Sequence, residues 1–178
     1  VRLGSPSPAR AAVDLFEEVI AMDPAFAPAY AGLADAWAAM SVNRVDSAAR
    51  PDEALDLMKP AVERALQLDP LLAEAHAALG VVLARDWRWA EAEAAFRHAI
   101  ELNGSISSIY VNFVMSALWP QGKVDESVRQ LRAALHRDPL SLDVQARLAN
   151  VLVSAGRYEE SIELGRRLVI SAPAADEG

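Results

Sequence analysis

A regularly spaced break between helical segments constrains this chain more than any other feature of its sequence. Five segments with the apolar spacing of a helix are each followed by a residue pair that stops a helix. From Pro24 the successive breaks are 46, 34, 35 and 34 residues apart. Such a period predicts a repeat protein with one helical hairpin per repeat. The breaks are Asp23-Pro24, Asp69-Pro70, Asn103-Gly104, Asp138-Pro139 and Ala172-Pro173.

The residues between the breaks resemble the tetratricopeptide repeat family, whose units hold two antiparallel helices, A and B. This resemblance implies an all-α solenoid, an α-α superhelix of about four full repeats after an N-terminal half repeat. Its helix A positions are Tyr30, Leu33, Ala34, Trp37; His76, Leu79, Gly80, Leu83; Tyr110, Phe113, Val114, Ala117; and Gln145, Leu148, Ala149, Leu152. Its helix B positions and stops are Ala12, Phe16, Pro24; Met58, Val62, Pro70; Ala92, Phe96, Gly104; Ser127, Leu131, Pro139; and Ser161, Gly165, Pro173.

We expect one domain over residues 1–178, divided at the breaks. The half repeat covers residues 8–24, the full repeats cover 25–70, 71–104, 105–139 and 140–173, and a truncated tail covers 174–178. The first full repeat carries an insertion near 41–52, after which Pro51 begins a helix. The third has one extra residue near Trp119-Pro120.

Small residues are placed where two helices must approach closely or where the chain must turn. Gly80 is expected to bring helices A and B of its repeat together. Gly122 and Gly156 precede helix B segments and are expected to supply turn residues with positive φ. Gly165 replaces a large apolar residue of the last helix B, so a void or a close helix contact is expected there.

Composition excludes several classes of function for this segment. A formal net charge of -8 and a pI near 4.9 disfavour binding to nucleic acid. The chain has no cysteine, so disulfides and thiolate metal sites are impossible. No stretch approaches the about 18 apolar residues of a membrane span, and the N-terminus lacks a signal-peptide apolar region, so a cytoplasmic location without membrane contact is expected.

No residue pattern points to catalysis, a cofactor or a metal. His76 occupies a packing position, and His98 and His136 are expected on the surface of helix B segments. The carboxylate pairs, such as Glu159-Glu160, fit helix starts or solvated faces better than acid/base pairs. Gly122-Lys123 lacks the remaining residues of a phosphate loop. Trp87 and Trp89 are interpreted as packing residues instead of a ligand cage.

A closer resemblance rests on three segments. Residues Ala27 to Trp37, Asp86 to Asn103 and Asp138 to Leu142 resemble the repeat region attached to winged-helix regulators, adenylate cyclases or serine/threonine kinases in bacterial signalling proteins. That resemblance implies a protein-binding scaffold within a longer chain. The alternative it leaves open is a ligand-sensing regulatory region of a fused enzyme or transcription regulator.

A partner is expected on the concave surface that the family forms from its A helices. The family's groove offsets, the sixth and ninth residues of each repeat, select Gly32, Asp35, Ala78, Val81, Asn112, Met115, Arg147 and Asn150. The predicted site is a groove in which a peptide lies over Val81, Val111 and Met115, with Arg147 and Asn150 orienting its polar end. An empty groove, or one filled by other segments of the protein, is the alternative.

Two further expectations concern partners. Some relatives grip a C-terminal carboxylate with paired lysines, but here those positions hold Ala31, Ala77 and Glu74, which argues against such a clamp. The terminal helices lack polar caps, so they are candidates for self-association or for packing against other segments of the parent protein.

Overall fold

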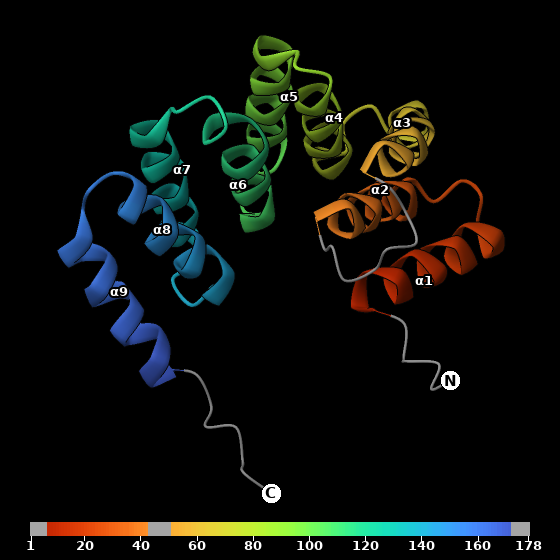
Figure 1. Cartoon of the computed structure of the whole chain (residues 1–178). Helices are drawn as coiled ribbons and strands as arrows, with labels where there is room; N and C mark the ends of the chain where they lie inside the picture. The colour runs from red at the N-terminus through yellow and green to blue at the C-terminus, as the bar shows by residue number, and fades with distance from the viewer. Residues whose placement is uncertain (1–6, 43–50, 172–178) are drawn as a thin grey trace, which may run out of the picture. The chain divides into compact units, whose positions relative to one another are not determined.

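The structure, a computed structural model, is built from helices throughout the part of the chain that it describes, residues 7–42 and 51–171 (Figure 1). Within each unit, consecutive helices joined by short turns run antiparallel (Figure 1), and the helical fold confirms the predicted all-α fold class and agrees with the predicted repeat count. The elements are α1 (Pro8–Met22), α2 (Ala27–Val42), α3 (Pro51–Leu68), α4 (Ala73–Arg85), α5 (Trp89–Leu102), α6 (Ser107–Phe113), the π-helical turn η1 (Val114–Leu118), α7 (Val124–Arg137), α8 (Leu142–Ser154) and α9 (Tyr158–Ser171).

The helices group into two compact units, residues 1–103 and residues 104–178. In the first unit α2 packs against α1, α3 and α4, and α4 also packs against α3 and α5. In the second unit α6 and η1 pack against α7, α7 packs against α8, and α8 packs against both α6 and α9. Helix A of one repeat therefore contacts helix A of the next within each unit, through α2–α4 and α6–α8.

Alanines let the helices of the first unit approach closely. Ala31, Ala65 and Ala75 form a buried cluster where α2, α3 and α4 meet. A Cβ built on Gly80 would lie 2.7 Å from the ring of Phe96, so only glycine fits there without a shift. This confirms the predicted close contact between α4 and α5. Gly32 likewise faces the ring of Phe16 in α1, so it also marks a close helix contact.

Larger side chains fill the core of the second unit, where Tyr110, Phe113, Leu118, Leu131 and Val144 are almost wholly buried. Helix α9 is the exception, because a Cβ built on Gly165 would meet nothing within 4 Å. Of the two expectations for Gly165, open space is therefore the one observed. Missing contact atoms at such a gap weaken the packing of a helix.

The turns before the A helices share one hydrogen bond, which we call the turn clasp. A side chain in the first turns of helix A bonds to the backbone carbonyl of the residue six positions earlier, at the break itself. The clasps are Tyr30 Oη to Pro24 O at 3.1 Å, His76 Nε2 to Pro70 O at 2.8 Å, Tyr110 Oη to Gly104 O at 3.1 Å and Gln145 Nε2 to Pro139 O at 2.8 Å. Because a carbonyl only accepts, Nε2 of His76 carries its hydrogen.

At the first two Asp-Pro breaks the Asp side chain adds a second fixed contact. Asp23 Oδ1 accepts from Ala25 N at 3.0 Å, and Asp69 Oδ1 accepts from Leu71 N at 2.9 Å. A carboxylate that binds the backbone two residues ahead stabilises a turn, while the following proline cannot continue the helix. These bonds explain why Asp-Pro marks the repeat boundaries.

The turns between helices A and B confirm the role predicted for glycine. Gly122 and Gly156 each have φ of +71°. The residue after each glycine donates to a carbonyl five positions back, Lys123 N to Leu118 O at 3.0 Å and Arg157 N to Leu152 O at 2.9 Å. In the second full repeat the same place is taken by Trp87, with φ of +61°. A non-glycine residue there is strained.

Helix α3 begins at Pro51, as predicted, and it continues through Pro60. The insertion predicted near 41–52 falls mostly on residues 43–50, which lie outside the described residues.

Candidate binding surfaces

The predicted groove residues of the first unit lie on α2 and α4. Ala78 and Val81 are buried, with 0% and 4% of their surface exposed. Asp35 is half-buried. Of these three residues, only Asp35 therefore presents an appreciable part of its surface to a ligand.

Asp35 has an unusual environment. Its Oδ1 atom is out of contact with water and has no hydrogen-bond partner. Burial, and then the negative charge of Glu74 on α4, raise the pKa of Asp35 from 3.8 to about 7. Burial disfavours the charged form because a carboxylate loses its hydration. The repeat offset of Asp35 predicts a groove position and carries no sign of this electrostatic state.

The predicted groove residues of the second unit are more accessible. Val111 is buried, Asn112, Met115 and Arg147 are half-buried, and Asn150 is exposed. Arg147 pairs with Asp143 one turn earlier in α8, with 3.2 Å between Nε and Oδ1. This pair is solvent-exposed, and such pairs contribute little to stability. The guanidinium is therefore available to a partner at small cost.

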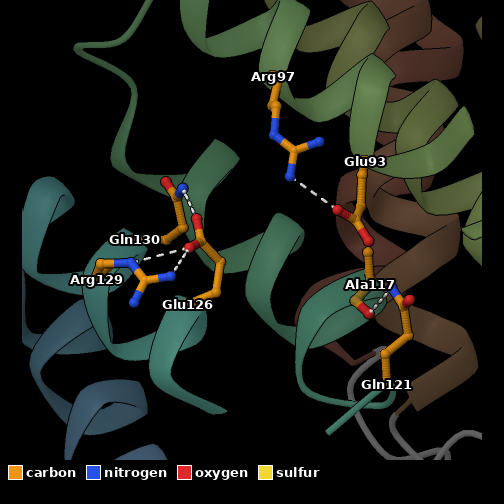
Figure 2. A network of polar contacts seen from close by, with 7 residues as sticks. All are labelled: Glu93, Arg97, Ala117, Gln121, Glu126, Arg129 and Gln130. Atoms are coloured by element: carbon orange, nitrogen blue, oxygen red, sulfur yellow. Dashed lines mark hydrogen bonds and ion pairs between the residues drawn. The ribbon is translucent and has the colours of Figure 1, made fainter. Parts of the chain in front are cut away.

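A π-helical turn lies within this surface. Residues Val114–Leu118 form η1, and Trp119 N donates to Val114 O, five residues back, at 2.9 Å. One residue more than an α-helical turn is thus accommodated, which accounts for the extra residue expected near Trp119-Pro120. Gln121 Nε2 donates to Ala117 O at 2.8 Å and satisfies a carbonyl at the end of the turn (Figure 2). Met115 lies in η1, and π turns are frequent at functional sites.

Several charged side chains on the B helices pair along their own helix, and Arg132 of α7 also pairs with Glu160 of α9 at 2.6 Å. Arg97 donates to Glu93 at 2.9 Å in α5, and in α7 Glu126 accepts from Arg129 Nε at 3.0 Å and Gln130 Nε2 at 2.7 Å (Figure 2). Local pairs of this kind stabilise a helix by tenths of a kcal/mol. They bring no set of reactive groups together.

One expectation about an aromatic residue was wrong, and one aromatic contact was not predicted. Trp87 is 77% exposed, so it is not a packing residue; it stacks edge-to-face on Trp89 with 5.4 Å between ring centroids. His76 and His98, from α4 and α5, also stack edge-to-face with centroids 4.5 Å apart. Sequence spacing missed this contact because the two rings come from facing helices.

Apolar side chains are exposed on the first and last described helices. Leu15, Val19 and Met22 follow one face of α1 at helical spacing, and Met22 is 86% exposed. At the other end of the chain, Tyr158 and Ile162 of α9 are more than half exposed. These are the helices for which the sequence predicted uncapped faces.

Neither a metal cluster nor a membrane span is found in the described ranges. Residues 7–42 and 51–171 contain no group of three or more His, Asp or Glu side chains placed to hold a metal ion. Within the same part of the chain, no helix combines the length and apolarity that crossing a membrane requires.

The hairpins, their turn clasps and the A-to-B turns define a helical repeat protein. Residues 116–176 match the family model described as tetratricopeptide repeat. Over that part of the chain the match confirms the tetratricopeptide resemblance. No curated protein sequence matches the chain.

Solved structures share the fold across most of the chain. A thermophilic TPR protein of Thermus thermophilus has a TM-score of 0.64 and 24% identity, over 82% of this chain and 73% of that one. YrrB, described as a TPR protein with an unusual peptide-binding site, has a TM-score of 0.57 and 20% identity, over 94% of this chain and 79% of its own. MamA has a TM-score of 0.57 and 17% identity, over 90% of this chain and 86% of its own. At these identities the likeness establishes the fold alone.

Proposed function

We propose that this chain is a protein-interaction module that binds a peptide or a partner protein on the helix-A faces of its hairpins. The observation that carries the proposal is the helix-A surface of the second unit. Asn112 of α6 and Arg147 of α8 occupy the same repeat position on two helices that contact each other, and Met115 and Asn150 share the other groove position of these two repeats. A half-buried apolar side chain is thus combined with amide and guanidinium donors, which suits recognition of a peptide backbone and its polar end.

The fold supports binding over catalysis. Tetratricopeptide hairpins typically serve as scaffolds that present a continuous surface to a partner. Among the described residues, Asp35 is the acid whose pKa is raised strongly, and the charged group that acts on it is another acid, Glu74. The solved structure of YrrB, whose description mentions a peptide-binding site, has the same fold.

The wider setting is also a proposal. The three segments quoted from Ala27 to Trp37, Asp86 to Asn103 and Asp138 to Leu142 favour a module of a larger bacterial signalling protein in the cytoplasm. The exposed apolar stripe of α1, Leu15, Val19 and Met22, supports self-association through the terminal helices. Leu15→Glu should then lower the sedimentation-derived mass of the assembly, and a mass equal to one chain at all concentrations would exclude self-association.

The binding proposal is tested with peptides selected from a displayed random library. Arg147→Glu should weaken the affinity of the selected peptides by about tenfold, because it removes a donor and adds repulsion. Met115→Asp should weaken affinity similarly by placing a charge in the apolar part of the surface.

Matched controls introduce the same kinds of charge change away from the helix-A surface. Arg166→Glu in α9 and Leu140→Asp before α8 alter exposed residues elsewhere in the same unit. They should leave affinity unchanged. If both groove variants bind as well as the wild type, the helix-A surface of the second unit is not the binding site.

A further inference from the structure

An unpaired carboxyl oxygen is buried on helix α2 of the first unit. Helix α2 packs against α1, α3 and α4, and Oδ1 of its residue Asp35 has no hydrogen-bond donor. Among the described residues, Glu74 of α4 is the one charged group that acts on Asp35, and it is also an acid. Two like charges therefore act together here, and no lysine or arginine among the described residues compensates Asp35.

This arrangement is unfavourable for stability alone. A buried carboxylate without a hydrogen bond loses hydration and gains nothing in return, so proteins normally pair such groups. A neutral side chain of the same size would avoid the cost. Acids kept in such environments are concentrated at sites where a ligand completes their contacts.

The missing partner has a definable chemistry. Oδ1 is an acceptor when Asp35 is ionised, and Glu74 adds further negative potential, so the site favours a cationic donor. Metal coordination is not supported, because the described residues hold no third ligand group. An ammonium or a guanidinium needs only one or two carboxylates and donates several hydrogen bonds. The chain's net charge of -8 also attracts cationic partners.

We propose that Asp35 and Glu74 form a receptor for one lysine or arginine side chain of the peptide that the module binds. The inference rests on the proposed binding function. It adds a preference for a cationic side chain, which the groove predicted from the repeat offsets did not include. Asp35 as a residue is half-buried, whereas its Oδ1 atom is covered, so a cation reaches Oδ1 only by displacing the groups that cover it. The cation then donates to Oδ1 and holds Asp35 in its ionised form.

The test uses small ions that mimic the two side chains. Butylguanidinium and butylammonium chloride are titrated into the whole chain, and the carboxyl carbon of Asp35 is followed by NMR over a pH series. We expect either ion to lower the titration midpoint of Asp35 by about one unit or more. Sodium chloride at equal ionic strength and sodium butyrate should not do so.

Variants separate the receptor from general electrostatics. Asp35→Asn should weaken butylguanidinium binding by about tenfold, the effect of one charge-assisted hydrogen bond, and Glu74→Gln should weaken it less. Asp143→Asn, an acid on the second unit, should have no effect. If the organic cations move the Asp35 midpoint no further than sodium chloride does, or if Asp35→Asn binds them as well as the wild type, the inference is overturned.

The same peptide library separates this inference from the proposed function. Peptides selected by the wild type should carry Lys or Arg at one position, and Asp35→Asn should lose that preference while still selecting peptides. Selection without any preference for a cation would reject the receptor and keep the binding function. Failure to select any peptide would reject the binding function, and the ion titration would still decide whether Asp35 and Glu74 hold a cation.

Discussion

The helix-A surfaces of the two units occupy equivalent repeat positions and differ in their chemistry. In the first unit Ala78 and Val81 are buried and Asp35 holds an uncompensated Oδ1. In the second unit Arg147 is paired with Asp143 at the surface and Asn150 is exposed. The difference teaches that a repeat offset fixes the direction of a side chain, whereas its burial and its neighbours decide what the side chain does.

The largest expected effect on stability comes from removing the buried charge of Asp35 in the first unit. The folded-state pKa of Asp35, about 7, lies above its ordinary value of 3.8, so the folded protein binds this proton more tightly than the unfolded chain. The stability associated with this proton is present below pH 3.8 and is lost as pH rises to about 7. Asp35→Asn should therefore raise the free energy of unfolding at pH 8 by up to about 4 kcal/mol.

Urea denaturation at pH 8 and at pH 4 measures this effect. The gain should shrink greatly at pH 4, where Asp35 is protonated in the folded protein. Asp143→Asn in the second unit should change the free energy by less than about 1 kcal/mol at either pH. A gain for Asp35→Asn that is equal at both pH values would show that ionisation of Asp35 is not its cause.

The next largest effects on stability are expected at two helical glycines, one from each unit. Gly80→Ala should destabilise the protein by about 1–3 kcal/mol, because the new Cβ meets the ring of Phe96. Gly165→Ala should stabilise it by up to about 1 kcal/mol, because alanine favours the helix and nothing lies within 4 Å. Thermal unfolding followed by circular dichroism gives both values, and equal signs for the two variants would contradict the packing described.

A smaller effect compares the turns between helices A and B. Gly156→Ala should cost about 1 kcal/mol, because φ of +71° is unfavourable for a residue with a Cβ. Trp87→Ala retains a strained non-glycine residue and should lose only the stacking contact with Trp89, about 0.5–1 kcal/mol. Urea denaturation of both variants measures the difference; a harmless Gly156→Ala would mean that this turn relaxes.

The smallest difference in stability is expected between variants of two turn clasps. Tyr110→Phe should cost about 1 kcal/mol, because Tyr110 is buried and the carbonyl of Gly104 loses its donor. Tyr30→Phe should cost less, since Tyr30 is half-buried and water can replace its hydroxyl. Hydrogen exchange of the amides near each turn resolves the two, and a larger loss for Tyr30→Phe would reverse the proposed order.

Much of the fold could be predicted because its signals are local. Asp-Pro breaks, glycines with positive φ and the helical spacing of apolar residues act within a few positions, so α3 began at Pro51 and Gly122 and Gly156 had the expected φ. The candidate surface was less predictable. Burial of Val81, the lone Oδ1 of Asp35, the stacking of His76 on His98 and the exposure of Trp87 all depend on neighbours from other helices, which an offset along the chain does not encode.

Because of the π-helical turn Val114–Leu118, this fold accommodates a repeat that is one residue longer. An insertion in an ordinary helix rotates every later side chain by about 100°, so a packed face would turn away from its neighbours. Here the surplus residue is confined to one widened loop of backbone, and Gly122 still closes the hairpin as Gly156 does in the next. A lineage can therefore gain or lose one residue at this place without remodelling the hairpins downstream.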